Sequence, residues 1–127
     1  MVPSKPKPKP DPSLKSTPVD LGWTLTFSAE LVAGQPSKAH YSFAIRDGAG
    51  QKIADSSGYM EVTAGVVQAQ WCALGYGLKW LVDNYCQPNG LLLKGPAEVL
   101  NMLNFNCPEK WMAYRKRCEE LIFTLKF

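Results

Sequence analysis

The stretch Ala69-Gln70-Trp71-Cys72-Ala73-Leu74-Gly75-Tyr76-Gly77-Leu78 lies in the middle of a segment with helical periodicity. Apolar and small residues recur there at steps of three and four, which predicts an amphipathic helix over about 64–84 with Thr63 as its N-terminal cap. Each glycine costs a helix about 1 kcal/mol relative to alanine, and this helix contains both Gly75 and Gly77. Because these glycines lower the stability of the helix, their presence predicts that the helix packs closely against a sheet at this point.

Three segments before the helix have the character of β-strands. Residues 22–33 alternate between apolar and polar side chains, residues 39–46 place aromatic and aliphatic residues on one face, and a third strand is expected over about 51–61. The connecting segments 34–37 and 47–50 contain glycine together with proline or aspartate, which is typical of turns. The first half of the chain is therefore predicted to be a three-stranded antiparallel meander.

The second half combines a short apolar run with two further helices. Residues 91–93 are three consecutive leucines, as expected for a buried parallel strand. A helix over about 96–104 begins with a proline, and Pro108 opens a final helix that is expected to end near residue 124. Residues 121–127 also alternate, so a terminal strand is the alternative, but no turn residue separates them from the preceding helix.

The first 20 residues form a separate region. They hold six of the ten prolines, and four lysines against two aspartates give them a charge of +2 out of the total of +3. Such a composition predicts an extended, disordered arm, which serves either as an electrostatic arm or linker or as a solvated tail. Residues 21–127 form the predicted domain and carry only +1, which is low for a domain that binds phosphates through overall charge.

Several classes of site and location are disfavoured by the sequence. The four cysteines form no CxxC pair, so a zinc site is not expected. Cys72 and Cys118 lie in helical apolar patterns and are predicted to be reduced core thiols. His40 is the only histidine and is predicted to be structural or exposed. Without a long apolar run or a signal peptide, we expect no membrane contact and an intracellular location, cytoplasmic or nuclear. The cysteines are Cys72, Cys86, Cys107 and Cys118.

Three segments resemble the ribonuclease H domains of plants and retroelements. Tyr41–Ala54 is similar to their second and third strands, Ala69–Leu78 to their central helix, and Gly95–Leu103 to the segment after their fourth strand. The resemblance covers about residues 22–125. It implies a ribonuclease H-like α/β fold, whose mixed sheet has three antiparallel strands plus one or two parallel strands and is packed by helices.

The resemblance also implies a degenerate active site. In the family, carboxylates from strand one, the central helix and the end of strand four hold two magnesium ions that cut RNA in an RNA–DNA hybrid. Here the strand-one aspartate falls on Ser28 or Ala29, the helix glutamate on Gln70 and the strand-four aspartate on Gly95. A fourth family carboxylate lies beyond the point where this chain stops. No metal or other cofactor is therefore expected.

An active enzyme is the alternative. Glu30 on strand one and Glu98 after strand four are fallback carboxylates, and magnesium is a cofactor only if they are used. Two carboxylates are a poor site for two divalent ions, which need several anionic oxygens. The family's glycine-rich turn after strand one is shortened to residues 34–37, and its fifth strand is absent or reduced to the terminal stretch. An unpaired sheet edge would invite pairing with another chain.

The last predicted helix carries a basic group that is similar to the basic handle with which some family members grip the hybrid. The cations suit phosphate contacts, and the aromatics suit either stacking against bases or packing into the core. The candidate nucleic-acid-binding residues are Lys110, Trp111, Arg115, Lys116 and Arg117.

The sequence thus predicts a catalytically degenerate ribonuclease H-like module that binds nucleic acid or a protein partner. The candidate partners are an RNA–DNA hybrid or RNA, a protein, or a second copy of the chain paired through an exposed sheet edge. The alternatives are an active metal-dependent ribonuclease H and a structural or self-association domain of a retroelement or viral polyprotein. The domain is either whole or truncated at its C-terminal end.

Overall fold

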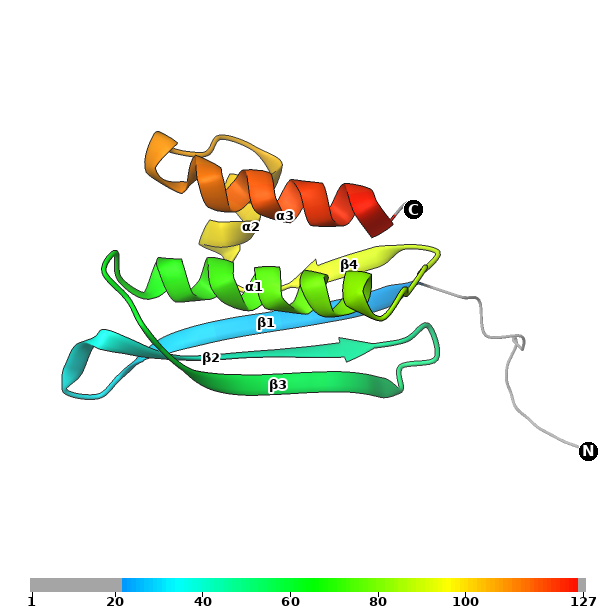
Figure 1. The fold of residues 1–127 in the computed structure, drawn as a ribbon, viewed down its shortest axis with the longest axis horizontal. Helices are drawn as coiled ribbons and strands as arrows, with labels where there is room; N and C mark the ends of the chain where they lie inside the picture. Colours follow the sequence, from blue (N-terminus) through cyan, green and yellow to red (C-terminus); the bar gives the residue numbers. More distant parts are fainter. Residues whose placement is uncertain (1–21, 126–127) are drawn as a thin grey trace, which may run out of the picture.

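Four strands and three α-helices follow one another in the computed structural model, which describes residues 22–125 (Figure 1). The arm predicted over residues 1–20 lies outside the described residues. One turn of 3₁₀ helix, η1, precedes the last α-helix. The elements are β1 (Trp23–Val32), β2 (Gln35–Arg46), β3 (Lys52–Glu61), α1 (Val66–Asp83), β4 (Leu91–Lys94), α2 (Ala97–Asn104), η1 (Glu109–Trp111) and α3 (Met112–Leu125).

The four strands form one mixed sheet in the order β3-β2-β1-β4. β1 and β2 pair antiparallel with Phe27 opposite Phe43, and β2 and β3 pair antiparallel as well. β4 pairs parallel with β1, so that Lys94 lies opposite Thr26. This arrangement confirms the predicted meander and the predicted parallel strand.

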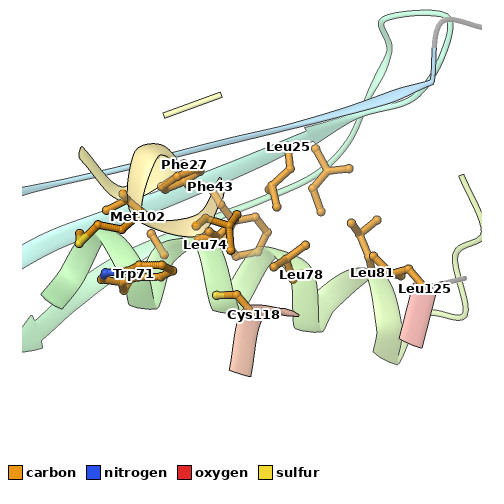
Figure 2. Close-up of a cluster of buried hydrophobic side chains, with 14 of the residues drawn as sticks. Leu25, Phe27, Phe43, Trp71, Leu74, Leu78, Leu81, Met102, Cys118 and Leu125 are labelled. Atoms are coloured by element: carbon orange, nitrogen blue, oxygen red, sulfur yellow. The ribbon is translucent and has the colours of Figure 1, made fainter. Parts of the chain in front are cut away.

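Helices cover one face of the sheet. Along β1, Leu25 and Phe27 are almost fully buried, whereas Thr26 and Ser28 between them are exposed. The buried side chains meet α1, and the opposite face of α1 packs against α3 (Figure 2). The molecule therefore has a sheet layer, α1 packed on one face of it, and α3 on the far side of α1 from β3 (Figure 1). We call the uncovered side of the sheet the open face.

β4 departs from its prediction in one respect. Three consecutive leucines predicted a strand that is buried on both faces, but Leu92 is 56% exposed. Leu92 lies opposite Thr24 and so belongs to the open face, where no described helix covers the sheet. Leu91 and Leu93 on the covered face are partly buried against the core.

Two local predictions are wrong for identifiable reasons. Thr63 does not cap α1, because the helix starts after Gly65 and the Gln68 side chain accepts hydrogen bonds from the backbone N–H groups of Thr63 and Ala64 at 2.8 and 2.9 Å. The first turn is shorter than residues 34–37, because β2 already begins at Gln35, which pairs with Val32. Gly34 allows this tight reversal with a φ of 75°.

The final helix runs to Leu125, which confirms the helical prediction for this segment. Trp111, Cys118 and Leu125 recur every seven residues, and all three are buried in the main core. The segment is therefore a helix and not the alternative terminal strand, because helical spacing places all three side chains in the core.

The two glycines of α1 have different reasons to be glycine. A β-carbon at Gly77 would lie 2.5 Å from Cδ1 of the fully buried Leu25, whereas one at Gly75 would meet nothing within 4 Å. Gly77 alone thus accounts for the close approach of helix and sheet that the sequence predicts.

Alanine substitutions should separate these two positions. Gly75→Ala is expected to raise the free energy of unfolding by about 1 kcal/mol, because alanine is the better helix former. Gly77→Ala is expected to lower it by about 1 to 3 kcal/mol, because the packed Leu25 has to move. Urea denaturation of the two variants measures both changes, and equal effects at the two sites would contradict the proposed packing.

Candidate functional site

The positions that the resemblance aligns with family carboxylates lie on β1, on α1 and directly after β4. Ala29 is two residues beyond Phe27 and packs with Ala69, the residue before Gln70, in a small buried cluster. Gly95 directly follows Lys94, the partner of Thr26, and lies against the Phe27 ring. Ala29 and Gly95 therefore both lie near Phe27 of β1, and Gln70 directly follows Ala69 on the helix that packs over this part of the sheet.

The structure separates the two candidates on β1. Ser28 points to the open face, where its hydroxyl lies 3.0 Å from that of Ser42. Ala29 lies on the face covered by α1, because it shares the parity of Leu25 and Phe27 and packs in the cluster with Ala69. Of the two positions, only Ala29 is on the same side of the sheet as Gln70.

The space beside Gly95 is filled by an aromatic ring. A β-carbon at Gly95 would lie 2.6 Å from two ring carbons of Phe27, which is far inside van der Waals contact. Phe27 is itself 1% exposed and belongs to the main core. A side chain of any kind at position 95 therefore requires the ring to move.

The fallback carboxylates do not come together. Glu30 pairs with His40 on the open face and lines a shallow hollow there with His40 and Tyr59. Glu98 is exposed in the first turn of α2, on the helical side of the sheet. Within residues 22–125, no group of three or more histidine, cysteine, aspartate or glutamate side chains is arranged to hold a metal ion.

The basic group of α3 is only partly available to a ligand. Trp111 is 6% exposed and packs in the core, so it cannot stack against a base, and its place in the candidate site is wrong. The Arg115 guanidinium is held by Glu119 at 3.1 Å and donates to the Phe105 carbonyl oxygen at 3.0 Å. Lys110 lies over the Trp111 ring.

Three of the candidate cations are exposed, and Lys110, which lies over the Trp111 ring, is one of them. Lys116 and Arg117 are the other two, and neither forms an ion pair with another residue in the described part of the chain. Arg117 borders a hollow of about 250 Å³ between α1 and α3, opposite Lys79 and Asp83. The predicted basic surface thus keeps Lys110, Lys116 and Arg117, of which Lys116 and Arg117 lie on α3.

The prediction of a core thiol is confirmed for Cys118 but wrong for Cys72, which lies on α1 outside the core. All four are free thiols, and Cys118 is buried between α1 and α3. Burial raises the pKa of the Cys118 thiol to about 12, although the nearby Arg117 acts in the opposite direction. Burial also raises the pKa of Cys72, which is only half-buried. Neither thiol is poised for nucleophilic chemistry, which requires a lowered pKa.

Sequence reasoning missed the character of the open face. Thr26, Ser28, Ser42 and Ser57 give it a hydroxyl-rich centre around a hollow of about 310 Å³. Next to it, the His40 ring lies 5.0 Å from that of Tyr59, so this histidine is a structural surface residue. One pattern in the sequence could have revealed this surface: serine and threonine residues alternate with the core positions along the strands.

Comparisons with known proteins give one kind of match. No protein-family model matches the chain, and no curated protein matches it in sequence. Solved structures do match. RNase H1 from the halophilic archaeon Halobacterium salinarum superimposes with a TM-score of 0.65 over 81% of this chain and 80% of its own, at 18% identity. The fold is that of ribonuclease H.

Two further ribonuclease H structures show the same similarity. The N-terminal RNase H domain of a Mycobacterium tuberculosis protein matches with a TM-score of 0.65 and 13% identity over 80% of this chain and 75% of its own. LC11-RNase H1, isolated from compost by a metagenomic approach and solved with an RNA/DNA hybrid, matches with a TM-score of 0.67 and 17% identity over 80% and 76%. At such identities the likeness concerns the ribonuclease H fold alone.

No helix among the described residues combines the length and the apolar character that a membrane span needs.

Proposed function

We propose that this chain is a catalytically degenerate ribonuclease H-like module that binds a partner and does not cut it. The observation that carries the proposal is the Phe27 ring, which fills the space where a side chain at position 95 would have to lie. The ribonuclease H neighbours supply the fold, and the resemblance of residues 41–54 favours the plant and retroelement type. On this proposal the module needs no cofactor and acts inside the cell, as part of a retroelement or viral assembly.

The chemistry at the three aligned positions supports the proposal. Two-metal hydrolysis needs anionic oxygens that converge on two cations about 4 Å apart. Ala29 and Gly95 offer no oxygen on a side chain, and Gln70 offers a neutral amide. Glu30 faces the other side of the sheet, so a shift of its rotamer does not restore a ligand. The site keeps the shape of the fold without the charge that magnesium requires.

Nucleic acid is the preferred partner because of Lys116 and Arg117. These two exposed cations lie on α3, the last helix, and a cation of this kind contacts phosphate without reading sequence. LC11-RNase H1 was solved with an RNA/DNA hybrid, which makes a hybrid the first ligand to test on a chain of this fold. Because two cations release few counterions, we expect weak binding that depends on salt.

The protein at micromolar concentration should not cleave a labelled RNA–DNA hybrid, with or without magnesium. The assay follows the RNA strand by gel, and an active ribonuclease H1 serves as the positive control. Glu30→Gln is the internal control, because any cleavage that depends on this residue would disappear. Magnesium-dependent cleavage by the pure protein, lost in Glu30→Gln, would overturn the proposal.

Binding is measured separately, by fluorescence anisotropy of a labelled hybrid at low salt. Lys116→Gln/Arg117→Gln is the informative variant, and Lys79→Gln on α1 is the matched control, since Lys79 is already paired with Asp83 at 2.7 Å. Selective weakening in the double variant supports nucleic acid as the partner. The absence of binding to hybrid, duplex or single strand would favour a protein partner, with the sheet edges β3 and β4 as the surfaces to test.

A further inference from the structure

α3 presents a stripe that no element of the described residues covers, on the side opposite the core. Met112, Lys116, Glu119 and Phe123 follow one another at steps of four, three and four, so they lie in one line along the helix. The buried residues Cys118 and Leu125 occupy the other side of the same helix. Phe123 is 83% exposed and Met112 is 44% exposed, although both are large apolar side chains.

The stripe is complementary to itself. A two-fold axis that crosses α3 between Arg117 and Cys118 makes two copies of the helix antiparallel. Met112 and Phe123 are equally distant from that axis, and so are Lys116 and Glu119. The axis therefore brings Met112 onto the second copy's Phe123, and Lys116 onto the second copy's Glu119. Two apolar contacts then enclose two ion pairs.

The geometry points to a second copy of this chain as the occupant of the stripe, and we propose that α3 mediates an antiparallel homodimer. Closed two-fold interfaces use the same patch on both subunits, as this stripe does. A hollow of about 500 Å³ beside Phe123, bordered by Lys116 and Thr124, gives the second copy's Met112 a place to lie. The inference does not require the proposed function, but both use Lys116, so a dimer and a bound phosphate would compete for this side chain.

The charges define the register. Glu119 already accepts from Arg115 of its own helix at 3.1 Å, and Lys116 forms no ion pair in the described part of the chain. In the dimer, Lys116 supplies Glu119 with a second cation. A parallel pairing would instead place Lys116 on Lys116 and Glu119 on Glu119, which is repulsive. Charge thus selects the antiparallel arrangement, and the apolar ends stabilise it.

The expected affinity is low. A standard protein interface buries roughly 800 Å² on each partner, and a single helix stripe buries less. We expect a dissociation constant on the order of 100 µM, so the dimer is visible only at high protein concentration or when another contact holds two copies together.

The first test is sedimentation equilibrium of the full 127-residue chain between micromolar and millimolar concentration. Phe123→Ser is expected to weaken dimerisation at least about tenfold, because it removes both apolar contacts of the symmetric pair. Phe105→Ser is the matched control, since Phe105 is 71% exposed but does not lie on the stripe. A wild-type protein that stays monomeric, or a dimer that Phe123→Ser leaves unchanged, would overturn the proposal.

A charge exchange tests the register. Lys116→Glu alone and Glu119→Lys alone should each weaken the dimer, because each places like charges opposite one another. Lys116→Glu/Glu119→Lys should restore dimerisation to within about threefold of the wild type, since the opposite charges meet again. Circular dichroism checks that the helix is retained. Failure of the double variant to recover would place the interface elsewhere and overturn the antiparallel register.

A direct observation comes from isotope-filtered NMR of a sample that mixes labelled and unlabelled protein. The Met112 methyl group and the Phe123 ring are separated by eleven residues, or about 16 Å along one helix. A nuclear Overhauser effect between them can arise only across two molecules. Its presence at millimolar concentration is expected, and its absence from a sample that sedimentation shows to be dimeric would overturn the proposal.

Discussion

Gly95→Asp is expected to lower the free energy of unfolding by about 1 to 3 kcal/mol, because its β-carbon overpacks the core against the Phe27 ring. The new β-carbon would lie 2.6 Å from the Phe27 ring, which is 1% exposed and is packed in the main core. Urea denaturation measures the loss. Gly90→Ala is the control at the other end of β4, since a β-carbon there meets nothing within 4 Å.

A double-mutant cycle identifies the cause of that loss. Gly95→Ala should destabilise the protein less than Gly95→Asp. Phe27→Leu should make room for the new β-carbon, so Gly95→Ala/Phe27→Leu should lower the free energy of unfolding by less than the sum of the two single variants. Strict additivity would show that the ring and the glycine do not compete for the same space. Wild-type stability in Gly95→Asp would remove the main support for a degenerate site.

Trp71→Ala is expected to lower the free energy of unfolding by about 3 to 5 kcal/mol, because Trp71 is 1% exposed and fills the space between α1 and the other helices (Figure 2). Its indole N–H makes no hydrogen bond with any described residue. Trp71→Phe removes this unpaired donor together with some volume, so its cost is expected to be within about 1 kcal/mol. Chemical denaturation compares the two variants.

The result that would contradict this prediction is a similar loss in both variants. Such a loss would mean that the volume of the indole, and not only the aromatic contact that phenylalanine keeps, is needed at this position. Phe105→Ala is the surface control, because Phe105 is 71% exposed and should change stability by less than about 0.5 kcal/mol.

The architecture could be predicted because most of it follows from periodicity. Alternation along β1 separated Leu25 and Phe27 from Thr26 and Ser28, and the spacing of Trp111, Cys118 and Leu125 fixed the last helix. The failures arose where a long-range or side-chain contact competed with a local pattern. The Gln68 side chain binds the backbone N–H of Thr63 before the helix, which starts after Gly65 without a side-chain cap, and the pairing of Gln35 with Val32 shortened a turn.

The candidate site was predicted less well, because a one-residue shift along a strand changes the face on which a side chain lies. The sequence left Ser28 and Ala29 open, and only the pairing of β1 with β2 and its packing under α1 separated them. Trp111 fits equally well in a core and in a binding surface until α1 and α3 are placed together. Amino-acid composition likewise does not show that the Phe27 ring occupies the space beside Gly95.

The alternation of β1 restricts how this strand can change over evolutionary time. Point substitutions at Ser28 or Ala29 leave the strand in place, so a lineage can gain or lose polar groups there one residue at a time. An insertion or deletion of one residue would instead exchange the two faces, which would bring Phe27 to solvent and Ser28 under α1. Among homologues of this chain, we therefore expect β1 to vary in residue type while its length between Leu25 and Ala29 stays constant.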